Sequence, residues 1–273
     1  MTASPAVPLA APRPRAITEL LEASIQLWRR EWTTFGALAV AGATPLALIA
    51  LAAMPRVMDA KRQTDMAWWM AVTPFGIAGI IFYLIADAAV VIVTSHAYLD
   101  TPISAVNALR AAWKSAASIT LVTAMKFAVV GGPIVATIAL SRAGNPLATF
   151  DAAVATLVWS SYWLCRLVTV PAPVVLEELD ASRAFRRSLQ LTNSSVKHIA
   201  RAMAPIGIIY MVLSFGVDLV ATLASQTATQ TMIVSSAGQL VFLSVVTVFA
   251  TLLYYDLRVV RDGFDAERPI GSA

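Results

Sequence analysis

Three charged side chains lie inside long apolar runs of this 273-residue chain, where burial of a charge is most costly: Asp87, Lys126 and Arg166. If the runs are helices rising 1.5 Å per residue, all three lie roughly 10–15 Å from the same membrane surface. Asp87 can then pair with Lys126 or with Arg166. Such a pair is either a salt bridge that fixes helix packing or part of a polar cavity that binds an anionic solute or a lipid headgroup. Alternatively, Lys126 extends its amine to the headgroups.

Motifs for catalysis or metal binding are missing from the sequence. It has two histidines, His96 and His198, which are far apart, and it contains no His-Glu-x-x-His, no Gly-x-Ser-x-Gly and no glycine-rich phosphate loop. Glu177 and Glu178 resemble the paired glutamates of membrane-embedded prenyl-processing proteases, but the downstream histidines are absent. The single cysteine, Cys165, excludes an internal disulfide. We predict a protein that is not an enzyme and needs no metal or cofactor.

The charged residues are held by six apolar runs, each long enough to cross about 30 Å of hydrocarbon as a helix. Hydrophobic residues make up 58% of the chain and charged residues only 13%, far from the balance of a soluble domain. A helix is required because lipid offers the backbone no hydrogen-bond partner. We therefore predict an all-α, polytopic membrane bundle of six transmembrane helices. The expected spans are 33–54, 67–97, 117–140, 148–174, 202–224 and 232–255.

Lysine and arginine residues outside the spans set the expected orientation. Most of them fall in the tails and in the loops between spans two and three and between spans four and five, which predicts cytoplasmic N- and C-termini. We expect one membrane domain over 16–262, preceded by a disordered proline-rich tail at 1–15 and followed by a tail at 263–273. The net charge is +4, and the basic residues flank apolar segments, so the expected partners are anionic lipid headgroups rather than nucleic acid.

Short amphipathic stretches precede the first, third and fifth spans, at 17–29, 103–114 and 181–199. Their order suggests a unit of one short helix and a two-span hairpin, used three times. Basic helices of this kind lie flat at the cytoplasmic surface. They either cover the ends of the bundle or form a docking surface for an acidic partner or lipid. The candidate basic face lies on the third stretch: Arg183, Arg186, Arg187 and Lys197.

Two segments carry a resemblance to a known family. The segment 171–202, with AFRRSL at 184–189, and the close LYYDLR at 253–258 followed by GFD at 263–265 resemble a bacterial six-span family. LWRR at 27–30 is a looser similarity. That family is the membrane domain fused to some glycerophosphodiester phosphodiesterases, together with its stand-alone relatives. Val260 and Asp262 depart from its usual close. The resemblance implies the fold and a bacterial inner membrane, without the soluble catalytic barrel.

Two functions follow as expectations. The first is a non-enzymatic inner-membrane protein that organises or assists membrane components, including a membrane-protein partner, through its basic cytoplasmic face. The alternative is a transporter or lipid-translocating protein that uses Asp87, Lys126 and Arg166. The sequence specifies neither the substrate nor the oligomeric state.

Overall fold

The computed structural model describes residues 16–57, 66–142, 145–193, 195–225 and 227–262, so the tails predicted at 1–15 and 263–273 lie outside it. Every regular element in these ranges is a helix, which confirms the all-α prediction. In chain order the helices are α1 (Ile17–Arg30), α2 (Trp32–Val57), α3 (Met66–Tyr98), α4 (Ala105–Lys114), α5 (Ala116–Ser141), α6 (Pro146–Leu167), α7 (Pro171–Leu176), α8 (Ala181–Thr192), α9 (Val196–Ala224) and α10 (Ala228–Asp262).

Six segments are long and apolar enough to cross a membrane, as predicted, so the protein is a multi-pass membrane protein. The three short helices α1, α4 and α8 each precede a hairpin of two long helices, which is the predicted order of elements. The candidate spans are Trp32–Ile49, Val72–Tyr98, Ala116–Ser141, Pro146–Leu176, Val196–Ala224 and Val234–Asp262.

Two helix boundaries differ from the sequence prediction. The fourth span is divided, because α6 ends at Leu167 and α7 begins at Pro171, whose missing N–H is tolerated only at the start of a helix. The predicted amphipathic helix at 181–199 is also divided. It ends at Thr192, and α9 begins at Val196, so Lys197 belongs to the first turn of the fifth long helix.

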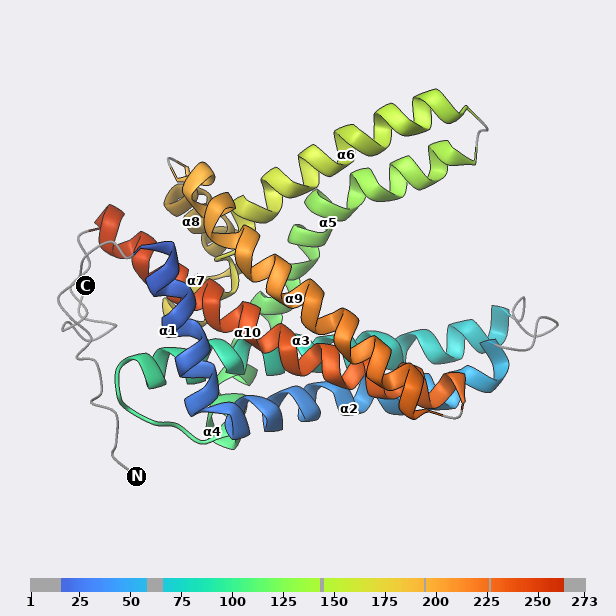
Figure 1. Ribbon diagram of the computed structural model, residues 1–273, viewed down its shortest axis with the longest axis horizontal. Helices are drawn as coiled ribbons and strands as arrows, with labels where there is room; N and C mark the ends of the chain where they lie inside the picture. The colour runs from blue at the N-terminus through green and yellow to red at the C-terminus, as the bar shows by residue number, and fades with distance from the viewer. Residues whose placement is uncertain (1–15, 58–65, 143–144, 194, 226, 263–273) are drawn as a thin grey trace.

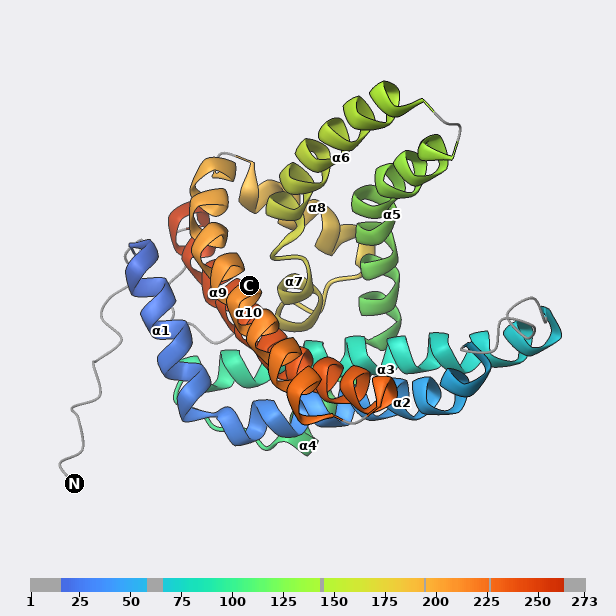
Figure 2. The same cartoon turned by 45° about the vertical axis from the view of Figure 1, so that its right-hand side comes forward.

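Helices α2, α3, α9 and α10 run side by side along the molecule, and α1, α4, α7 and α8 gather at one end of them (Figure 1). We call this end the capped end, and the opposite end, where α2 and α9 end, the far end. The hairpin of α5 and α6 leaves the capped end at an angle, and its tip lies away from the far end in both views (Figures 1 and 2). The main bundle and the hairpin are thus two arms joined at the capped end.

Burial is concentrated in α3 and α10. Helix α3 buries an almost continuous segment from Ile85 to Val93, and α10 buries Phe249 and the run from Leu252 to Tyr255. Helix α10 contacts α1, α2, α3, α8 and α9, which makes it the central element of the main bundle. Figure 1 shows it crossing behind α9 toward the capped end.

Close backbone approach joins α2 to α3 at Gly42. A Cβ atom added there would lie 2.8 Å from Cβ of Ala86, whereas one added at Gly36, on the same helix, would meet nothing within 4 Å. Small residues at membrane helix interfaces permit such close packing. Residue Gly42 therefore sets the distance between the two helices.

We predict that Gly42→Ala is less stable than Gly36→Ala by about 1–3 kcal/mol, the usual cost of overpacking. Both variants gain the same helix propensity, so their difference isolates the contact with Ala86. Thermal unfolding of both variants in detergent measures this difference. Equal melting temperatures would show that α2 and α3 separate at no cost.

Candidate functional site

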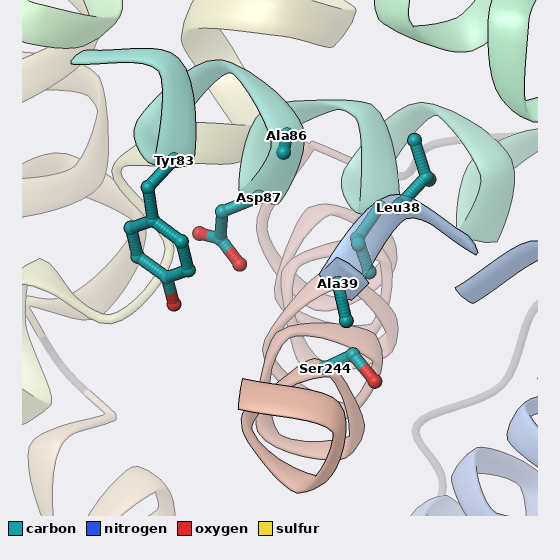
Figure 3. A pocket seen from close by; sticks show the side chains of 7 residues that line it. Leu38, Ala39, Tyr83, Ala86, Asp87 and Ser244 are labelled. Carbon is teal, nitrogen blue, oxygen red and sulfur yellow. The ribbon is translucent and has the colours of Figure 1, made fainter. Parts of the chain in front are cut away.

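Asp87 lies on α3 and is half-buried against α10. Its carboxylate accepts a hydrogen bond from the hydroxyl of Thr247, at 2.7 Å. It also lines a small pocket between α2, α3 and α10, together with Ala39, Tyr83 and Ser244 (Figure 3). In Figure 3 the carboxylate lies beside the Tyr83 ring. The sequence predicted that Asp87 lies inside an apolar span, and the structure gives it a polar neighbour on another helix, Thr247.

Lys126 lies on α5 and is also half-buried. The charges of Lys126 and Asp87 interact. No described carboxylate lies within 4.0 Å of the Lys126 amine, so the two residues are close without forming a direct salt bridge. The structure thus brings together two of the three predicted charges.

The third charge, Arg166, has other partners. Its guanidinium donates hydrogen bonds to Oδ1 of Asn193 at 3.2 Å and to the backbone oxygen of Leu189 at 3.3 Å, and it also contacts the hydroxyl of Tyr162. These acceptors lie at the C-terminal end of α8, where free carbonyls and the helix dipole favour a cation. The predicted pairing of Asp87 with Arg166 is not found among the described contacts. Arg166 fastens α6 to α8.

Helix α8 presents two different sides. Asp180 caps its first turn, accepting from the backbone N–H of Arg183 at 2.9 Å, and this hydrogen bond, with a second from Ser182, holds the pKa of Asp180 below its usual value. One side is buried, from Ala181 and Ala184 through Thr192. The other side exposes Arg183 and Arg186, and Lys197 is exposed on the first turn of α9.

Arg187, the fourth residue of the candidate basic face, turns inward to a carboxylate. Its Nε lies 3.3 Å from Oε2 of Glu177, and its guanidinium donates to Asp262 on α10. Arg258 lies 3.7 Å from Glu177, and the hydroxyl of Tyr254 donates to the same carboxylate. Burial lowers the pKa of Arg187, but the bond to Asp262 and the charge of Glu177 raise it overall above its usual value.

We call Glu177, Arg187, Tyr254, Arg258 and Asp262 the Glu177 network. It contains two cations and two carboxylates, so its formal charge is balanced. It joins the end of α7 and the middle of α8 to the last turns of α10, and it connects the two segments that carried the family resemblance. Sequence reasoning missed this network, because residues about 80 positions apart carry no local signal of their contact. The only available signal was that both segments stood out from the rest of the chain.

Side chains that could ligate a metal are dispersed over the described ranges. No group of three His, Cys, Asp or Glu side chains there is arranged to hold a metal ion. Nδ1 of His96 lies 3.0 Å from the backbone oxygen of Thr101, and Nε2 of His198 lies 4.0 Å from Asp256. Neither histidine is in contact with Glu177 or Glu178 in these contacts, and Glu177 instead pairs with the arginines of the Glu177 network.

Neither the family models, nor the curated proteins, nor the solved structures contain a match to this chain. The fold and the site define its class, which is a multi-pass membrane protein with six candidate spans. Any function must be inferred from the chain's own residues.

We predict that Glu177→Gln lowers the free energy of unfolding by about 1–3 kcal/mol, since it leaves two partly buried arginines with one carboxylate fewer. Glutamine keeps an acceptor for Tyr254, so the change removes charge more than shape. Unfolding of the purified protein in mixed micelles measures the effect. Glu178→Gln is the matched control, because Glu178 is exposed beside it. Equal losses in both variants would contradict a role for the network.

Proposed function

We propose that this is a non-enzymatic protein of the bacterial inner membrane, with both termini in the cytoplasm, that organises or assists other membrane components through its capped end. The family resemblance supports the bacterial membrane, and the distribution of lysine and arginine supports the orientation. The observation that carries the proposal is the division of α8 into an anchored side and an exposed basic side.

Anchoring makes the exposed side of α8 a preformed surface. The buried residues of α8, the hydrogen bond between Thr169 and Ser188 at 3.0 Å, and the Glu177 network fix the helix against α6 and α10. Arg183 and Arg186 can therefore bind a partner without breaking the ion pairs that hold α8 in place. The one ion pair that Arg183 makes is an exposed contact with Asp180, at 3.2 Å. Cations on a fixed helix suit an anionic partner, because little side-chain and backbone order remains to be lost on binding.

Other exposed basic side chains of the capped end lie outside the exposed side of α8 and are expected to face the lipid headgroups rather than the partner. They lie on α1, α4 and the ends of α9 and α10, where the chain is expected to meet the cytoplasmic leaflet. Each basic residue near an anionic surface contributes about 1 kcal/mol of attraction. The residues are Arg29, Arg110, Lys114, Arg201 and Arg261.

We predict that replacing Arg183, Arg186 and Lys197 together by glutamine weakens partner binding about a hundredfold, from three losses of about 1 kcal/mol. Arg187 is left unchanged, because its loss would disturb the Glu177 network. To measure binding, a photo-reactive residue replaces Gln190, which is exposed beside this surface. The yield of covalent adducts with the partner is then measured in cells of the source bacterium.

The matched control replaces Arg29, Arg110 and Lys114, which are equally exposed on α1 and α4. The control variant should keep the adducts formed at Gln190, whereas the α8–α9 variant should lose them. Full adduct yield in the α8–α9 variant, or the same loss in both variants, would contradict recognition by this surface.

The alternative function, transport or lipid translocation, is favoured by one observation, the pocket that Asp87 lines inside the bundle. Proteoliposomes with fluorescent phosphatidylglycerol test it, since dithionite bleaches only the outer leaflet unless lipid crosses. If the proposed organising function is correct, about half of the fluorescence should resist bleaching. Complete bleaching that slows in Asp87→Asn and Lys126→Met would instead establish translocation.

A further inference from the structure

Helix α4 lies between two boundaries of the membrane. The second candidate span ends at Tyr98 and the third begins at Ala116, so both ends of α4 are a few residues from a span. At its end only Ser115 separates Lys114 from the third span. Because the chain leaves and re-enters the bilayer through this short connection, α4 is held at the bilayer surface beside the capped end (Figure 1).

The two sides of α4 differ in burial. Ala108 and Ala112 are fully buried, and Leu109 packs partly buried against the same core. On the opposite side Val106 is 65% and Trp113 is 58% exposed. These two residues are seven positions apart and therefore share one stripe of the helix. An exposed tryptophan at a membrane boundary is typical of a side chain that lies where lipid meets water.

Two cations flank this tryptophan on the exposed side of α4. Arg110 precedes Trp113 by about one turn, Lys114 follows it directly, and both are exposed. The guanidinium of Arg110 donates to Oδ1 of Asn107, a neutral acceptor, at 3.3 Å. Helix α4 contains no acidic residue, and neither cation has a carboxylate within 4.0 Å among the described residues.

The other two short helices have acidic partners for their cations. Helix α1 carries Glu19 in its first turn, and Arg30 at its end lies 3.4 Å from Glu31. At α8 the acidic partners of the arginines are the N-cap Asp180 and Glu177. Within the described ranges, α4 is thus the one short helix whose cations have no acidic partner. Its exposed side is complementary to an anion.

We propose that the exposed side of α4 binds an anionic phospholipid of the adjacent leaflet. Arg110 and Lys114 bind the phosphate oxygens of this lipid, since a guanidinium and an ammonium both suit phosphate. Trp113 lies between them at the level of the glycerol, with its ring toward the acyl chains. The site is separate from the exposed side of α8, and it does not depend on which face of the membrane meets the capped end.

Position favours a lipid over an acidic protein as the source of the anion. The two steps from Lys114 to Ala116 cover at most about 7 Å. The headgroup layer outside the hydrocarbon is about 5–8 Å thick on each side of the bilayer. Lys114 therefore lies at the level of the headgroups, and one helical turn places Arg110 beside it. A lipid phosphate is already within reach there, whereas a protein would first have to displace the lipid.

Brominated lipid tests the site in the full-length protein, because bromine quenches tryptophan only at close range. The protein is reconstituted in phosphatidylcholine vesicles in which a minor fraction of the lipid carries bromine near the top of its acyl chains. The brominated lipid is either phosphatidylglycerol or phosphatidylcholine. The chain has seven tryptophans, so the emission lost in Trp113→Phe is assigned to Trp113. We expect phosphatidylglycerol to occupy the site about thirtyfold more readily, from two basic residues near the surface.

Three pairs of substitutions assign this preference, each compared with its own Trp113→Phe form. Arg110→Gln with Lys114→Gln should abolish it. Arg110→Lys with Lys114→Arg should retain it, because both cations remain. Arg201→Gln with Arg261→Gln removes the same charge from exposed positions on α9 and α10 and should leave the preference unchanged.

Equal quenching of Trp113 by the two brominated lipids overturns the proposal, and this result needs no basic residue to be changed. The proposal also fails if the preference survives Arg110→Gln with Lys114→Gln. If acrylamide in the water quenches Trp113 and neither brominated lipid does, the exposed side of α4 faces water or a protein, and the lipid site is excluded. None of these measurements uses adduct formation at Gln190, so this proposal and that for α8 fail separately.

Discussion

The structure depends on one constraint, which is that hydrocarbon offers the backbone no hydrogen-bond partner. Each crossing segment must therefore satisfy its own N–H and C=O groups as a helix, and helix ends are pushed toward water. The irregular turn at 168–170 lies where the chain is covered by protein: Leu167, Thr169 and Val170 are buried against α7, α8 and the core. The short helices and most charges collect at the capped end, because charged and amphipathic segments are excluded from hydrocarbon and lie where the chain meets water.

Within lipid, apolar burial contributes little to the association of helices, since lipid tails are as apolar as leucine. Polar ties and close packing then decide which helices stay together. The hairpin is held by the bond from Trp159 to the backbone oxygen of Val129, at 2.8 Å, and from Ser160 to that of Val130, at 3.0 Å. The capped end is held by the Glu177 network and by Arg166. The outer hairpin has no such tie to the main bundle among the described residues, and this is where the two arms part.

Sequence patterns predicted the features that depend on position along the chain. Hydropathy located the spans, and counting 1.5 Å per residue placed Asp87 and Lys126 at similar depth. The same count could not show that Arg166 has different partners from Asp87 and Lys126, because a depth does not determine the direction in which a side chain points around its helix. Arg187 shows the same limit: periodicity placed it on a basic stretch, but only the neighbouring α10 makes its position an internal one. The divided fourth span depended on Pro171, whose effect is set by local backbone geometry.

Burial of charge has a different cost in two parts of the molecule. A balanced network such as that of Glu177 can be buried at moderate cost, because each cation there meets a carboxylate within about 4 Å. Lys126 has a carboxylate near it but not in contact, in a medium where each missing contact costs more. A protein that needed the lysine only for packing would gain stability from closing that gap.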